Sequence, residues 1–246
     1  MEAKGLISSE KAPQGVILEE IDTKVLQRNA NGILEVLSKN TYQNFPPAKL
    51  IAVTKTVSPV VVEKLKPLQI LDIGENRVQT AKAKMTEISP EFRLHWIGRL
   101  QSNKVKDIIE SVCMLHSLDR LVLAQEVNRR AGMCQRILPV LVQVNIAGET
   151  QKAGLDITEI RHFFDVLKSF SCLKVKGLMA MMPFAAEEQS LSNWFRQTRV
   201  LFEQLQAEAI QGIDMEELSM GMSNDYAIAA REGATMVRVG TALFRS

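Results

Sequence analysis

Short apolar runs rich in β-branched residues recur eight times along this chain of 246 residues, with amphipathic stretches between them. The runs are 50–55, 70–76, 93–100, 114–119, 139–146, 175–181, 217–223 and 236–244. Near-continuous apolar strands that alternate with helices are typical of a parallel sheet covered on both faces. Eight such units in about 250 residues favour a closed (βα)8 TIM barrel. An open doubly wound sheet is the alternative, but the sequence contains neither GxGxxG nor GxxxxGK[ST].

The N-terminal stretch differs from the rest. Residues 1–15 are polar and include Pro13 and Gly15, so we expect a mobile tail, followed by one barrel domain over 16–246. The tail has no apolar core that could act as a signal peptide. No run approaches the ~18 apolar residues of a membrane span. We therefore expect a cytoplasmic protein without membrane contact.

Charge and cysteine usage exclude several classes of partner. The chain has 30 basic and 28 acidic residues without a long run of one sign, which argues against binding to nucleic acid. Cys113, Cys134 and Cys172 are odd in number and form no CxxC pair, so neither a disulfide framework nor a zinc site is expected. His116 and His162 show no ligand spacing, and we assign no metal.

Lys55 ends the first apolar run. In such barrels the chemistry lies at the carboxyl ends of the strands. Side chains alternate along a strand, so Ile51, Val53 and Lys55 are expected to share a face that points Lys55 into the barrel mouth. A lysine amine in a partly apolar, cation-rich site is a nucleophile toward aldehydes. The alternative is an exposed lysine that only marks the strand end, which is the commoner case.

Arg238 lies within the last apolar run, between Val237 and Val239. A buried charge without a partner is costly, so this arginine needs one. Barrel closure places the last strand beside the first, which predicts that Arg238 and Lys55 face one small space. Between two cations we expect an anionic or electron-rich group. A salt bridge to a core carboxylate is an equally good explanation of Arg238.

Two turns near the last strands predict a phosphate site. Ser219 and Ser223 lie in the segment that closes the seventh run, and Gly240 and Thr241 form a turn in the eighth. Phosphate sites in these barrels often use the loops after strands seven and eight. Asn76 ends the second run, where it either binds a ligand oxygen or caps a helix. His95 lies within the third run, where a satisfied core histidine is the commoner case.

Several motifs in fixed order resemble one known family. The chain is similar to the pyridoxal phosphate homeostasis proteins, also called the YggS/PROSC family, from about residue 48 onward. The motifs are AVTK (52–55), GENRVQ (74–79), HWIGRLQSNK (95–104), VNIAGETQKAG (144–154), KGLMAM (176–181), ELSMGMSND (217–225) and VRVGTALF (237–244). The chain departs from the family after KGLM, where many relatives have a threonine and a more glycine-rich continuation.

The resemblance implies a barrel like the N-terminal domain of alanine racemase, with pyridoxal 5′-phosphate held as a Schiff base on Lys55. Arg238 matches the arginine that faces the pyridine nitrogen, and Asn76 a residue that lines the cofactor. The phosphate-cradle positions match Ser219, Ser223, Gly240 and Thr241. The family implies a role in vitamin B6 homeostasis and amino-acid balance, with PLP-dependent apo-enzymes as possible partners and no catalytic residue assigned.

An arginine at the ring nitrogen disfavours its protonation and weakens the cofactor as an electron sink. Racemases of this fold add a tyrosine base from a C-terminal domain of the partner subunit. Few residues follow Gly240, so we expect no such domain and a monomer. The two tyrosines are Tyr42 and Tyr226, and only Tyr226 stays open as a base. A cofactor carrier is expected; the alternatives are a weak amino-acid racemase and, by fold analogy, a Schiff-base aldolase.

Overall fold

The computed structural model describes residues 17–43, 45–148, 153–183 and 186–245. Eight parallel strands pair in chain order, and β8 pairs with β1, so the sheet closes into a barrel. The predicted (βα)8 barrel is confirmed, and the open-sheet alternative is wrong. The strands are β1 (Lys49–Val53), β2 (Asp72–Glu75), β3 (Arg93–Trp96), β4 (Val112–Leu118), β5 (Leu138–Val144), β6 (Leu173–Ala180), β7 (Ile213–Met222) and β8 (Met236–Val239).

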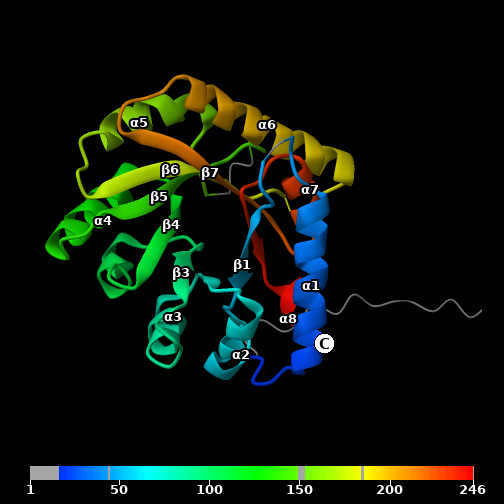
Figure 1. The fold of residues 1–246 in the computed structure, drawn as a ribbon. Helices are drawn as coiled ribbons and strands as arrows, with labels where there is room; N and C mark the ends of the chain where they lie inside the picture. The colour runs from blue at the N-terminus through cyan, green and yellow to red at the C-terminus, as the bar shows by residue number, and fades with distance from the viewer. Residues whose placement is uncertain (1–16, 44, 149–152, 184–185, 246) are drawn as a thin grey trace, which may run out of the picture.

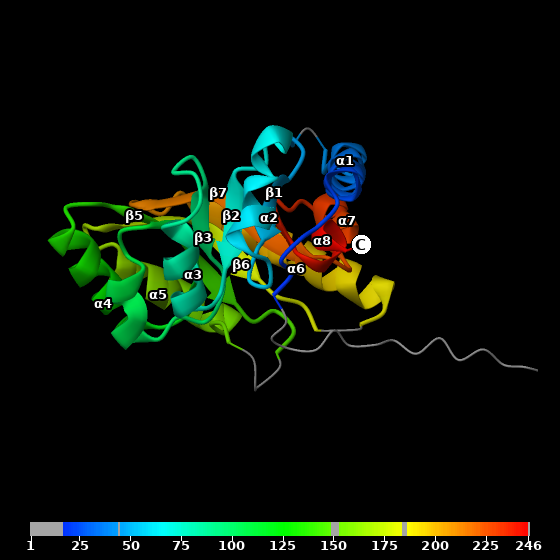
Figure 2. The same cartoon turned by 90° about the horizontal axis from the view of Figure 1, so that it is seen from below.

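Helices surround the strands, as Figures 1 and 2 show. The α-helices of the described residues are α1 (Thr23–Lys39), α2 (Pro59–Glu63), α3 (Val78–Met85), α4 (Leu121–Met133), α5 (Ile160–Leu167), α6 (Glu188–Ala207), α7 (Tyr226–Arg231) and α8 (Thr241–Phe244). Three 3₁₀ helices join them, namely η1 (Lys66–Leu68), η2 (Ser102–Asp107) and η3 (Ile157–Glu159). Only η2 connects β3 to β4, so this crossover lacks the α-helix found between most strands.

Periodicity explains why these segments form these elements. In α5 the buried residues are Ile160, Phe163, Phe164 and Leu167, which is the i, i+3, i+4, i+7 spacing of one helical face. The strands β2 and β8 are buried at every position, as expected for parallel strands with helices outside and side chains inside. Ser58 caps α2 through a hydrogen bond from the Val61 N–H, and Pro59 at the first helical position suits the start of a helix.

Two boundaries differ from the predicted ones. β1 ends at Val53, and Lys55 lies in a turn, so the strand alternation that was extended to Lys55 is wrong. The turn forms because the Val57 N–H bonds back to the Thr54 carbonyl. Residues 241–244 are the short helix α8 and not the end of the last strand, because the Leu243 and Phe244 N–H groups bond to the Gly240 carbonyl.

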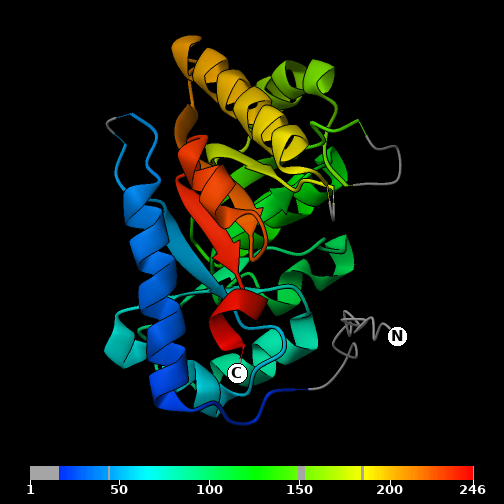
Figure 3. The same cartoon turned by 90° about the vertical axis from the view of Figure 1, so that its right-hand side faces the viewer.

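The helix α1 covers the seam between the first and last strands (Figure 3). It packs against α7 and α8 and buries Leu26, Ala30, Ile33 and Leu37. Asn29 Nδ2 donates to the Leu243 and Arg245 carbonyls at 3.1 and 2.7 Å. The predicted tail, residues 1–15, lies outside the described residues, as do 149–152 and 184–185, which fall in the VNIAGETQKAG motif and the segment after KGLM.

Candidate functional site

Lys55 occupies the turn that follows β1, and its side chain is exposed. It forms no hydrogen bond or ion pair with any residue the structure describes. The residue before it is held firmly: Thr54 is buried, and its Oγ1 donates to Glu75 Oε1 at 2.7 Å. Lys84 Nζ lies 2.6 Å from both the Thr54 carbonyl and Glu75 Oε1. Lys55 is therefore a side chain without an internal partner on a rigidly supported backbone.

Arg238 is buried in the middle of β8, opposite Ile51 of β1. Its Nη1 donates to Ser219 Oγ at 2.6 Å and its Nη2 to the Ala180 carbonyl at 2.9 Å. Within the described residues no carboxylate forms an ion pair with it, so the predicted alternative of a core salt bridge finds no support. Burial lowers the pKa of Arg238 to about 10, which still leaves a cation at neutral pH. An uncompensated buried cation attracts an anionic or electron-rich ligand.

The turns after β7 and β8 meet. Ser223 Oγ accepts the Gly240 N–H at 3.2 Å and the Ala242 N–H at 3.3 Å, and Thr241 between them begins α8. Gly240 presses closely on the end of β1, since a Cβ at this position would lie 3.2 Å from the Val53 carbonyl oxygen. The predicted cradle residues Ser223, Gly240 and Thr241 therefore lie together, and Gly240 lies against Val53, two residues before Lys55.

Asn76 directly follows β2, at the same end of the barrel as Lys55. Its Oδ1 is buried and has no hydrogen-bond partner among the described residues. It lies against Gly98 and borders a cleft of ≈ 550 Å³ that Arg77, Arg99 and Lys104 also line. A buried amide oxygen without a donor is costly, which is the signature of a group that a ligand completes.

The structure brings the predicted residues together in pairs: Ser219 with Arg238, and Ser223 with Gly240. Lys55 and Asn76 follow Thr54 and Glu75, which are hydrogen-bonded to each other. Sequence reasoning missed the buried Glu75–Lys84 pair and a contact between His95 and His116. The signal for the second was the placement of a histidine in each of two neighbouring apolar runs.

Two general features of the described residues bear on the class of site. The described residues include no group of three or more His, Cys, Asp or Glu side chains placed to hold a metal ion. None of the helices in those same parts of the chain is long and apolar enough to cross a bilayer.

The closed parallel barrel, with a buried arginine in its last strand and a lysine and paired turns at its carboxyl end, is the fold of the alanine racemase N-terminal domain. The family model described as alanine racemase, N-terminal domain, matches residues 21–246. Alanine racemase from Clostridium difficile 630 shares the fold, with a TM-score of 0.71 at 14% identity over 89% of this chain and 56% of that one.

More similar relatives narrow the class. The pyridoxal phosphate homeostasis protein of Aquifex aeolicus is 38% identical over 80% of this chain and 86% of its own, and that of Pseudomonas aeruginosa 36% over 79% and 83%. PipY of Synechococcus elongatus, solved with PLP bound, has a TM-score of 0.79 at 32% identity over 89% of this chain and 99% of that one. The chain belongs to the family of pyridoxal phosphate homeostasis proteins.

Proposed function

We propose that this chain binds pyridoxal 5′-phosphate at the carboxyl-terminal mouth of its barrel and serves as an intracellular carrier or regulator of that cofactor. One observation carries the proposal: Arg238 is a buried cation with two neutral acceptors and no carboxylate partner among the described residues. An electron-rich ring nitrogen is the kind of acceptor that this guanidinium lacks.

The residues present fit such a ligand. When bound, the cofactor supplies an aldehyde that condenses with a lysine amine to a C=N bond, with loss of one water. Lys55 is the amine we assign, because it lacks an internal partner and follows the strand next to Arg238. Ser223 and the N–H groups around Gly240 and Thr241 would hold the phosphate, and the unpaired Asn76 Oδ1 would accept a hydrogen bond from the ligand.

Ser219 has a different place from that of the other cradle residues. It lies inside β7, is fully buried, and contacts both Arg238 and His116. We therefore assign it to holding Arg238, and leave the phosphate to the turns.

A carrier is favoured over a racemase because a second base is poorly provided. Tyr226 begins α7 and is half-buried, and burial raises the pKa of its hydroxyl. A phenol with a raised pKa keeps its proton at neutral pH and is a weak base. Tyr42 lies under the Arg199 guanidinium, 4.1 Å from the ring centroid, and at the edge of Phe45. A cation at the ring nitrogen also weakens carbanion stabilisation.

The first test is spectroscopic. Protein loaded with the cofactor is expected to be yellow. Borohydride reduction should attach the cofactor permanently to the peptide that contains Lys55. Lys55→Ala should lose both signals, whereas Lys24→Ala, which removes an exposed lysine on α1, should keep them. A label that stays after Lys55→Ala would contradict the assignment.

Two further measurements separate a carrier from an enzyme. Steady racemisation of any amino acid, abolished by Lys55→Ala, would favour the racemase. Loaded protein mixed with an apo-enzyme and a scavenger of free cofactor would show whether transfer is direct. We also propose that the protein is a monomer in the cytoplasm. Light scattering, which measures the molar mass in solution, would test the oligomeric state.

A further inference from the structure

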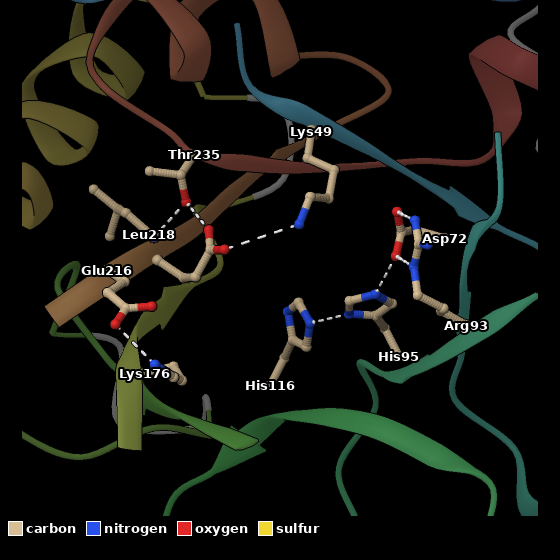
Figure 4. A network of polar contacts seen from close by, with 10 residues as sticks. Lys49, Asp72, Arg93, His95, His116, Lys176, Glu216, Leu218 and Thr235 are labelled. Carbon is tan, nitrogen blue, oxygen red and sulfur yellow. Dashed lines mark hydrogen bonds and ion pairs between the residues drawn. The ribbon is translucent and has the colours of Figure 1, made fainter. Parts of the chain in front are cut away.

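A line of hydrogen bonds crosses the interior of the barrel and ends on Arg238. Five links join six residues, and Figure 4 shows the first part of the line, with His95 between Asp72 and His116. Four strands besides β8 contribute to it. In order, the residues are Arg93, Asp72, His95, His116, Ser219 and Arg238.

The links are short. Asp72 Oδ1 lies 2.8 Å from Arg93 Nε and 2.9 Å from His95 Nε2. His95 Nδ1 and His116 Nε2 are 2.9 Å apart, as are His116 Nδ1 and Ser219 Oγ. The last link, 2.6 Å, is from Arg238 to Ser219.

The line is almost sealed from water. Asp72, His95, His116, Ser219 and Arg238 are each less than one-tenth exposed. Only the Arg93 side chain reaches solvent, with 54% of its surface exposed. Asp72 and Arg93 are the paired first residues of β2 and β3, so the line starts at the amino-terminal end of the barrel, away from the proposed cofactor site.

The direction of each hydrogen bond follows from the two ends. Burial raises the pKa of Asp72, but the hydrogen bonds from Arg93 and His95 outweigh it and hold the pKa well below its usual range. Asp72 is thus a carboxylate, which only accepts, so His95 Nε2 must carry a proton. At the other end Arg238 only donates, so Ser219 Oγ accepts from it.

The middle links then have one arrangement with neutral imidazoles. His95 Nδ1 accepts from His116 Nε2–H, and His116 Nδ1 accepts the Ser219 hydroxyl proton. His116 stays neutral because burial, with the positive charges of Arg238 and Lys49 acting in the same direction, lowers its pKa well below the usual value against the opposing charge of Asp72. Both nitrogens of each imidazole and the Ser219 hydroxyl have partners in this arrangement.

Protonation of His95 would reverse the middle of the line. Its Nδ1 would donate to His116, His116 would donate to Ser219, and the hydroxyl proton would need another acceptor. The imidazoles are faced by five charged or titratable groups, namely Asp72, Arg93, Cys113, Lys49 and Arg238, with Glu217 beside Lys49 and Asp225 toward Arg238.

We propose that the Asp72 carboxylate sets the direction of this line of hydrogen bonds, and that His95, His116 and Ser219 are positioning residues that orient Arg238. Because the Ser219 proton is committed to His116, Ser219 presents only lone pairs to Arg238. This fixes the guanidinium in one orientation, with its remaining N–H groups available to a ligand. The role of these N–H groups in ligand binding rests on the proposed function, whereas the direction of the hydrogen bonds does not.

The decisive measurement is the tautomer of each imidazole. The chain has only three histidines, and His162 is exposed on α5 and serves as a reference signal. In protein labelled with ¹⁵N-histidine and free of cofactor, long-range ¹H–¹⁵N correlations at pH 7 should show Nε2–H and unprotonated Nδ1 for both His95 and His116. An Nδ1–H tautomer or an imidazolium at either residue would overturn the inference.

Ser219→Ala removes the donor to His116 Nδ1 and should shift that nitrogen and, through it, the signals of His95. Ser117→Ala is the matched control, because Ser117 is also buried and hydrogen-bonded, to the Gly98 carbonyl, but lies outside the line. Asp72→Asn should move both imidazoles toward mixed tautomers, since an amide can donate as well as accept. If the ¹⁵N shifts of both imidazoles stay unchanged in Ser219→Ala, the residues of the line are not coupled, and the inference fails.

Cofactor binding gives an independent readout. Ser219→Ala and Asp72→Asn should bind the cofactor roughly ten- to a hundredfold more weakly, as expected for a weakened hydrogen bond from a charged group, and shift its absorbance. Ser117→Ala should bind like the unmodified protein. Equal affinities in all variants would overturn the positioning role. If no form binds the cofactor, the proposed function fails, whereas the tautomers still decide whether the line exists.

Discussion

Cys113 adjoins the Asp72 end of the buried line, and its environment makes a prediction at the scale of one residue. Burial, and then the negative charge of Asp72, raise the pKa of the Cys113 thiol to about 12. The thiolate is the reactive form, and an ordinary cysteine has a pKa of ~8.5. At pH 8 we therefore expect Cys113 to react with iodoacetamide at least about a hundredfold more slowly in the folded protein than in urea.

The measurement needs Cys113 as the sole thiol, so Cys134→Ser and Cys172→Ser provide the background. Asp72→Asn removes the neighbouring negative charge and should lower the pKa of Cys113 and speed the labelling several-fold at pH 8. A folded-state rate within tenfold of the unfolded one would show that Cys113 is not held protonated.

At the scale of elements, the buried Lys84–Glu75 pair fastens α3 to the ends of β1 and β2. Both side chains are at most 3% exposed. Breaking a buried pair leaves an uncompensated charge and costs about 3–5 kcal/mol. Lys84→Met should lower the free energy of unfolding by that amount in urea titrations followed by circular dichroism. Lys82→Met, at an exposed position of the same helix, should change it by less than about 0.5 kcal/mol.

The double variant Lys84→Met, Glu75→Gln tests the cause. It removes both charges, so it should recover part of the stability that Lys84→Met loses. If the double variant is as unstable as the sum of its parts, the loss comes from packing and not from the stranded carboxylate.

The elements also show what could be predicted from sequence. The strands were predictable because runs such as 139–146 are apolar nearly throughout, which only a doubly covered sheet requires. The end of β1 was not, because the apolar run continues into the turn that the Val57 N–H and the Thr54 carbonyl close, and Thr54 is also held by Glu75, 21 residues away. The helix α8 was read as part of the last strand because three of its four residues are apolar and four residues are too few to show a helical period.

The candidate site, like the fold, was predictable only in part. Lys55 and the cradle turns were picked out by their positions at the ends of apolar runs, and Arg238 by its charge within one. The line through His95 and His116 was not predictable from single residues. It requires the relative registers of β2, β3, β4 and β7, which are set by pairing and by irregularities such as the register shift between Leu94 and His95. The sequence shows only that two neighbouring apolar runs each contain a histidine, and not that the two side chains meet.

On the scale of the whole molecule, the proposed site joins the first and last parts of the barrel. Gly240 touches β1 at Val53, and α8 is tied to α1 through Asn29. A ligand that contacts Lys55, Arg238 and the Gly240 turn would therefore span the seam where the sheet closes. Opening that seam would break the ligand contacts, so binding should stabilise the entire barrel and not one loop.

The size of that stabilisation follows from mass action. A ligand at a hundred times its Kd stabilises the folded state by about 2.7 kcal/mol. For 150–250 residues each kcal/mol raises Tm by roughly 2–4 °C, so saturation with pyridoxal 5′-phosphate should raise Tm by roughly 5–10 °C. At the same cofactor concentration, Lys55→Ala should shift by less than half as much, because the covalent link is absent, whereas Lys24→Ala should match the unmodified protein. Equal shifts in the Lys55→Ala and unmodified proteins would mean that the cofactor binds without Lys55, and would contradict the assignment of Lys55 as its anchor.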